Sequence, residues 1–224
     1  MKFRTLLSAL LLAAGLVAAV GCGKSEKKDE KKTEKKADPQ PKRSGVLERQ
    51  FKIYHAKGFV AGEAIKSAKV SGKVLVVVNS GAKADKTNVE LYKGLEKGLG
   101  ATPVIEEIKD NPEIQEEPTP EMVNAVLAKH TDAKVIAFIG TMPEKFERLN
   151  IGAAKVFLFD YGYADLRTLK KAIEEGKIIG LLMNKEKAPK TKDKLEKTDK
   201  EIFDKRFFII NKGNIAKYAE YFQY

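Results

Sequence analysis

Four short apolar runs constrain the fold of this chain more than any other feature. They are continuous instead of alternating, and they cover residues 74–78, 135–139, 156–159 and 178–182. Runs of this length and kind are typical of parallel strands that are covered on both faces of their sheet. Two weaker candidates, residues 103–108 and 207–210, bring the expected number of strands to five or six.

Helical patterns alternate with these runs. Between residues 85 and 99, apolar side chains recur at helical spacing, and Gly100 is placed to end the helix. Thr119 and Pro120 form an N-cap followed by proline at the first helical position. Other helices are expected over 58–68 and 143–150 and from Asp165 toward Gly176, although two glycines weaken the first of these predictions. With right-handed crossovers, the alternation predicts a single doubly wound α/β three-layer sandwich with a strand order such as 2-1-3-4-5.

The first 21 residues have the three-part plan of an export signal. Lys2 and Arg4 precede an apolar run over 6–20, which is shorter than the roughly 18–20 residues of a membrane-spanning helix. Residues 19–22, Ala-Val-Gly-Cys, resemble the bacterial lipobox. In a lipobox the cysteine is first alkylated with a diacylglyceryl group, and the chain is then cut on the N-terminal side of that cysteine. Cys22 is the only cysteine, so lipidation accounts for a thiol that would otherwise be free. The alternative is a chance cysteine near an ordinary cleavage site.

Residues 22–44 are expected to link this anchor to the domain over 45–224. The stretch 23–43 is mostly Lys and Glu with no large apolar residue, a composition typical of a disordered tether. Two roles are open for this stretch. It is either a solvated spacer, or its basic residues each add about 1 kcal/mol of attraction to an anionic membrane. The bilayer is therefore the first expected partner, in the bacterial envelope, facing the periplasm or the cell exterior. Two or three acyl chains are enough for stable anchoring.

The formal net charge of +11 does not indicate nucleic-acid binding. Two of the charges, Lys2 and Arg4, leave with the signal peptide, and many others lie in the tether and in residues 185–200. No aromatic side chains interleave with these runs to stack on bases. We expect no nucleic-acid partner.

Polar residues follow the predicted strands where a doubly wound fold binds its ligands. Asn79 and Ser80 follow the first strand, Thr141 the third, Asp160 the fourth and Asn184 the fifth. Amide, hydroxyl and carboxylate groups together suit a polyhydroxy or amide ligand. The same residue types are common in ordinary turns, so that alternative stays open at each position.

Signatures of catalysis and of cofactor binding are missing from the sequence. The loop after the first strand has neither spacing of a phosphate-binding loop, and there is no nucleophile elbow. The two histidines, His55 and His130, stand apart from other candidate ligands, and His130 is expected to cap a helix end or face solvent. We therefore predict no catalytic residue, no metal and no cofactor, and an unrecognised hydrolase is a minor alternative.

Several segments resemble the periplasmic-binding-protein type 1 family, the sugar-binding proteins of ABC importers and their repressor relatives. They are a helix running into Ser-Gly-Lys-Val-Leu-Val-Val-Val over 71–78, Val-Phe-Leu-Phe-Asp over 156–160, the stretch 169–184 and the tail from 203. The resemblance is to the second lobe, and it implies that Asp160 and Asn184 contact a sugar. Departures are Asn184 where the family usually has Gln, Gly140–Thr141 in place of an Asn-Asp pair, and the missing first lobe.

These observations predict a membrane-anchored, non-enzymatic, solute-binding-like domain. Because family members enclose the ligand between two lobes, a second chain or a second copy would supply the missing wall. The alternative function is an envelope structural or protein-interaction lipoprotein that uses the same fold without a small ligand.

Overall fold

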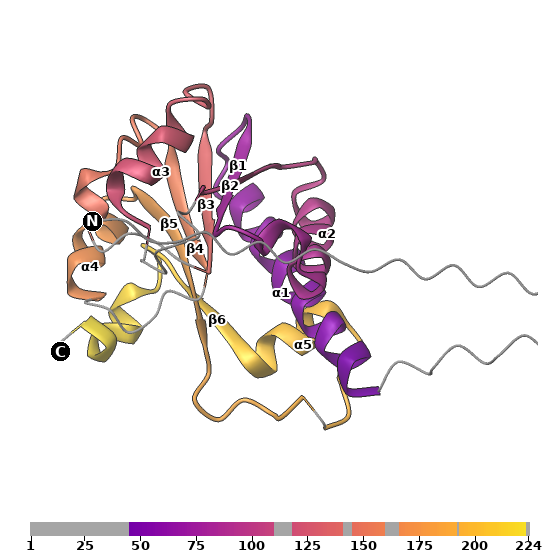
Figure 1. Cartoon of the computed structure of the whole chain (residues 1–224). Coiled ribbons are helices and arrows are strands. Elements are labelled where there is room, and N and C mark those ends of the chain that lie inside the picture. Colours follow the sequence, from indigo (N-terminus) through magenta and orange to yellow (C-terminus); the bar gives the residue numbers. More distant parts are fainter. Residues whose placement is uncertain (1–44, 110–117, 141–144, 160–165, 192, 223–224) are drawn as a thin grey trace, which may run out of the picture. The chain divides into compact units, whose positions relative to one another are not determined.

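Six strands among the described residues form one sheet in the order β2-β1-β3-β4-β5-β6 (Figure 1). The computed structural model describes residues 45–109, 118–140, 145–159, 166–191 and 193–222. The strands are β1 (Val74–Val78), β2 (Val104–Glu107), β3 (Val135–Ile139), β4 (Lys155–Phe159), β5 (Ile178–Asn184) and β6 (Phe207–Ile210). The first five pair in parallel, and β6 pairs antiparallel with β5. The predicted α/β class, mainly parallel sheet and strand order 2-1-3-4-5 are confirmed.

Helices cover both faces of this sheet, which gives the three layers visible in Figure 1. One face is covered by α1 (Gly45–Ser67), α2 (Lys86–Leu99) and α5 (Asp199–Arg206). The other is covered by α3 (Pro120–Leu127), α4 (Leu166–Glu174) and the 3₁₀ helix η3 (Ile215–Phe222). Alternate side chains of one strand face opposite layers: Val76 and Val78 pack toward α1 and α2, whereas Leu75 and Val77 pack toward the other layer. Because helices cover both faces of the sheet, side chains on both faces of its central strands are apolar, which explains the continuous apolar runs.

Four predicted helix ends are confirmed by their geometry. The Asp85 carboxylate accepts hydrogen bonds of 2.9 Å from the backbone N–H groups of Thr87 and Asn88, and Gly100 ends α2 with φ of 70°. Thr119 caps α3 directly before Pro120. Gly176, beyond the end of α4, also has φ of 70°.

The helix expected over 143–150 is wrong in its described part, where only the 3₁₀ turn η2 (Phe146–Arg148) forms. The Asn124 amide explains this ending. Its Nδ2 donates to the Arg148 carbonyl oxygen at 3.0 Å, and its Oδ1 accepts from the Asn150 N–H at 2.7 Å. These backbone groups are the ones that a longer helix would use, so α3 ends the turn.

The first helix extends further toward the N-terminus than predicted, and its glycines contact α2. A Cβ at Gly58 would lie 2.0 Å from the Leu91 carbonyl oxygen, and one at Gly94 would lie 2.0 Å from the His55 carbonyl oxygen. The glycines that weakened the helix prediction are thus the positions where the two backbones touch. The other 3₁₀ turn, η1 (Ala82–Ala84), links β1 to α2.

The predicted signal peptide and tether, residues 1–44, lie outside the described residues. None of the helices among the described residues is long and apolar enough to cross a membrane.

Candidate functional site

Asn79 stands where the strand order reverses. The chain passes from β1 to β2 on one side and then returns to β3 on the other, so the carboxyl ends of β1 and β3 flank the switch point. Asn79 directly follows β1, and its side-chain Oδ1 is buried without a hydrogen-bond partner among the described residues. Most buried polar atoms in proteins are paired, so this unpaired acceptor singles out Asn79 among the predicted site residues.

The turn after Asn79 is held in place by the neighbouring elements. The Asn79 carbonyl oxygen accepts from the Ala82 N–H at 3.1 Å, and Gly81 has φ of 74°. The Tyr92 hydroxyl donates to the Ala82 carbonyl oxygen at 3.2 Å. Burial, followed by the negative charges of Glu107 and Asp85, raises the pKa of Tyr92 to about 12. The phenol therefore stays protonated and keeps this hydrogen bond at neutral pH.

Further contacts join this turn to β2. The Lys83 N–H donates to Glu107 Oε1 at 2.8 Å, and Lys83 Nζ donates to the Ile105 carbonyl oxygen at 3.2 Å. Ser80, the second residue predicted here, is exposed beside the half-buried Asn79, whose Oδ1 is buried. Asn79 and Ser80 therefore form one polar position, which offers neutral hydrogen-bonding groups and no charge of its own.

Asn184 lies at the same edge of the sheet but far from Asn79. It is the last residue of β5, it is exposed, and it pairs with Phe207 of β6. Three strand spacings separate β1 from β5, which amounts to about 14 Å. The strand ends between them are those of β3 and β4, which lead to Thr141 and Asp160. These two residues and Cys22 lie outside the described residues.

Sequence reasoning missed Lys57, a cation buried in α1. Its side chain is 3% exposed, and its Nζ lies 5.1 Å from the ring centroid of Phe207 and 5.6 Å from that of Tyr54. Phe207 is the strand partner of Asn184, so Lys57 brings a positive charge toward the carboxyl edge of β5. The signal was present in the sequence, because Lys57 falls on the helical stripe of Ile53, Ala61 and Ile65 that is otherwise apolar.

The histidines are not isolated, which corrects the sequence-based expectation. His55 Nδ1 lies 3.3 Å from Asp199 Oδ1, a contact between α1 and α5. His130 is only 12% exposed, and its Nδ1 lies 3.0 Å from Lys73 Nζ while its Nε2 lies 3.3 Å from Glu106 Oε1. No group of three His, Cys, Asp or Glu side chains in the described ranges could hold a metal ion.

Comparisons with known proteins find similarity among solved structures. No family model and no curated protein matches the chain. A sugar ABC transport substrate-binding protein from Bordetella parapertussis matches 58% of this chain over 41% of its own length, with 17% identity and a TM-score of 0.38. A putative LacI transcriptional regulator from Bacteroides fragilis matches 74% of this chain over 61% of its own length, with 13% identity and a TM-score of 0.47.

A third match is a solute-binding protein of an ABC transporter from Burkholderia graminis, solved in complex with D-arabinose. The match covers 74% of this chain and 61% of the Burkholderia protein, with 17% identity and a TM-score of 0.45. This chain therefore spans less than two thirds of each of these three structures. At these identities the similarity extends to the fold alone.

Proposed function

We propose that this chain is a membrane-anchored lipoprotein whose α/β domain binds a sugar or a similar polar small molecule without catalysing a reaction. The observation that carries the proposal is the buried, unpaired Asn79 Oδ1 at the switch point of the sheet. Leaving a buried acceptor unsatisfied costs about 1–3 kcal/mol. A hydroxyl or N–H group of a ligand would remove that cost on binding.

The proposed ligand contacts are Asn79, Ser80 and Asn184, together with Thr141 and Asp160. Because Asn79 and Asn184 lie about 14 Å apart, a single small ligand contacts only part of this set directly. One lobe covers one side of a ligand, whereas a good site buries most of its surface. A second copy or another chain is therefore proposed as the opposite wall.

A thermal-shift screen against sugars and nucleosides tests solute binding. A ligand at about 100 times its dissociation constant stabilises the folded state by about 2.7 kcal/mol. For a domain of this size that corresponds to a rise of about 5–11 °C in Tm. The proposal fails if no sugar or nucleoside at millimolar concentration raises the Tm.

Three variants link such a shift to the site. Asn79→Leu removes the unpaired acceptor at similar volume and should abolish the ligand-induced shift. Ser80→Ala should reduce the shift. Ser71→Ala, an exposed serine just before the other end of β1, is the matched control and should leave the shift unchanged. Equal shifts in all three variants would exclude this edge of the sheet as the site.

The proposed anchor is tested separately at Cys22. In bacterial cells, Cys22→Ser should prevent the incorporation of a labelled fatty acid and, because cleavage follows alkylation, should leave residues 1–21 attached. A wild-type chain that incorporates no fatty acid would contradict lipidation. This result would leave the solute-binding test unaffected.

A further inference from the structure

A groove of about 860 Å³ lies apart from Asn79 and Ser80, between α1, α2 and the residues that lead into α5. Apolar side chains of Phe51, Leu195 and Ile202 contribute to its lining. The remaining lining residues are charged or titratable: Glu48, Arg49, Lys52, His55, Glu90, Lys194, Glu196, Lys197 and Asp199. None of these residues belongs to the proposed solute site.

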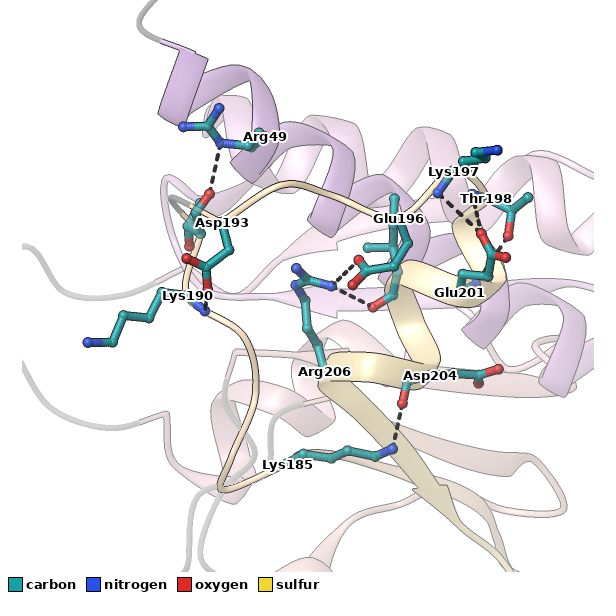
Figure 2. Close-up of polar contacts among 12 residues, drawn as sticks. Arg49, Lys185, Lys190, Asp193, Glu196, Lys197, Thr198, Glu201, Asp204 and Arg206 are labelled. Carbon is teal, nitrogen blue, oxygen red and sulfur yellow. Dashed lines mark hydrogen bonds and ion pairs between the residues drawn. The ribbon is translucent and has the colours of Figure 1, made fainter.

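The wall of the groove formed by the segment after β5 is fixed at several points (Figure 2). Arg49 Nε of α1 donates to the Thr191 carbonyl oxygen at 3.0 Å. Arg206, whose side chain is buried, places its Nη1 2.6 Å from Glu196 Oε2. Thr198 then begins α5 with a reciprocal capping box to Glu201. Thr191 is thus bonded to α1, Glu196 to Arg206 and Thr198 to Glu201, so the described residues of this wall are tied to the helices around the groove.

Three of the carboxylates in the groove are neutralised by cations that do not line it. Glu90 pairs with Lys93 at 2.7 Å, and Glu196 pairs with Arg206 at 2.6 Å. Asp199 pairs with Lys97 at 3.2 Å, in addition to its contact with His55. The side chains of these three carboxylates are only 20–27% exposed. These three carboxylates are therefore recessed and already paired, whereas the fourth, Glu48, is 64% exposed and lies 3.7 Å from Lys52 of the same groove.

The cations of the groove face solvent instead. Lys52 is 62% exposed, and Lys194 and Lys197 are also exposed. Four cations and four carboxylates line the groove, and Lys93, Lys97 and Arg206 pair with three of the carboxylates from outside it, which leaves the lining cations to set the charge that faces solvent.

We propose that this groove is a docking site for an acidic, partly apolar segment of a partner protein. Carboxylates of the partner would meet Lys194 and Lys197, while its apolar side chains would cover the half-buried Phe51 and Leu195. A concave site suits an extended or helical segment better than it suits the flat surface of a bilayer. Residues 23–43 of this chain carry nine Lys or Arg and five Asp or Glu, so the same sign of charge disfavours the chain's own tether as the occupant.

Fluorescence anisotropy with two peptides tests the proposal on the full chain. The first probe is a fluorescein-labelled ten-residue peptide of Glu, Leu and Gly, and its twin carries Gln in place of every Glu. The Glu peptide should bind several-fold more tightly at low salt, and this preference should shrink as salt screens the charges. Equal binding of the two peptides would overturn the proposal.

A charge-matched pair of variants locates the binding. Lys194→Gln with Lys197→Gln should weaken binding of the Glu peptide about 2- to 30-fold, as expected for two exposed ion pairs. Lys170→Gln with Lys171→Gln, on α4 in the opposite layer, removes the same charge and should leave the affinity unchanged. Equal weakening by both pairs would mean that net charge, and not the groove, drives binding. All four side chains are exposed, so both variants should fold, which a thermal melt checks.

The membrane is the competing occupant, and vesicles distinguish it. Chains carrying Cys22→Ser are mixed with vesicles of phosphatidylglycerol and phosphatidylcholine, so that the acyl anchor does not contribute. The proposal is overturned if the variant with Lys194→Gln and Lys197→Gln loses vesicle binding while its binding of the Glu peptide is unchanged. The solute screen does not depend on Lys194 or Lys197, so the two proposals can fail independently.

Discussion

Replacing Gly94 by alanine tests the packing of α1 on α2, on which one layer of the fold depends. The added Cβ would lie 2.0 Å from the His55 carbonyl oxygen and 2.9 Å from the Phe59 amide nitrogen. An ordinary contact for a Cβ begins at 3.4 Å, so the helices would have to move apart by about 1.4 Å here. The neighbouring atoms belong to the backbone, which cannot rotate away as a side chain does.

The expected cost follows from three opposing contributions. Alanine favours a helix interior over glycine by about 1 kcal/mol, which acts in favour of the variant. Overpacking a close contact costs typically about 1–3 kcal/mol. A gap of 0.5–1 Å forfeits about a quarter to a half of the dispersion energy of each facing atom pair, and the interface continues through Gly58, Gly62 and Gly98. The contact terms exceed the propensity gain, so Gly94→Ala should destabilise the protein by about 2 kcal/mol or more.

Urea unfolding and a thermal melt measure this effect. A loss of about 2 kcal/mol lowers the Tm by about 4–8 °C for a domain of this size. Gly45→Ala is the matched control, because Gly45 is also helical, is exposed, and has its nearest side-chain atom, Arg49 Nη1, 3.5 Å from the added Cβ. This control should change the Tm little. If Gly94→Ala is as stable as the control, the two backbones are not in contact and the reasoning is wrong.

Two further predictions concern buried polar groups. Since burial raises the pKa of Tyr92 to about 12, above about 10 in the unfolded chain, its stabilising contribution is present below about pH 10 and is lost as the pH rises through 12. An absorbance titration should show one late-ionising tyrosine that disappears in Tyr92→Phe; its persistence would refute the assignment. Arg206→Met leaves Glu196 half-buried without its partner and should cost about 3 kcal/mol in urea unfolding, with part of that loss recovered by Glu196→Gln on the same chain. Burial opposes ionisation of Glu196, but hydrogen bonds from its own backbone and from Arg206 hold its pKa below the ordinary value, so wild-type stability should fall more steeply than that of Glu196→Gln as the pH drops below about 4.5.

The sheet could be predicted from the sequence because burial on both faces leaves a local signature. The strands β1 and β3 are apolar at every position, β4 is apolar after Lys155, and polar or glycine residues follow these strands where they end. The antiparallel direction of β6 could not be predicted from its run, since that direction depends on α5 bringing the chain back to β5. The turn at 146–148 was misjudged for a similar reason: the Asn124 side chain that ends it lies in another helix.

The sequence predicts which candidate site residues follow strands, but it does not predict how far apart these residues lie in the fold. That Asn79 and Asn184 follow strands is a property of the sequence, but their separation depends on how many strands lie between them. The burial of the Asn79 amide and the contacts of Lys57 also arise only when distant elements pack together. Lys57 shows that a single charge on an apolar helical stripe merits as much attention as a strand end.

The proposed solute site and the groove are both next to the segment that follows β5, but this proximity does not by itself couple binding at the two sites. The segment that forms a wall of the groove begins right after Asn184, where the Lys185 N–H donates to the Arg206 carbonyl oxygen at 2.8 Å. Coupling between two sites requires an element with two arrangements that each ligand favours differently. Arg49 bonds to Thr191 and Arg206 to Glu196, and neither contact involves Asn79 or Asn184. We therefore expect the proposed binding of a solute at the sheet edge and the proposed binding of an acidic partner in the groove to be independent of each other.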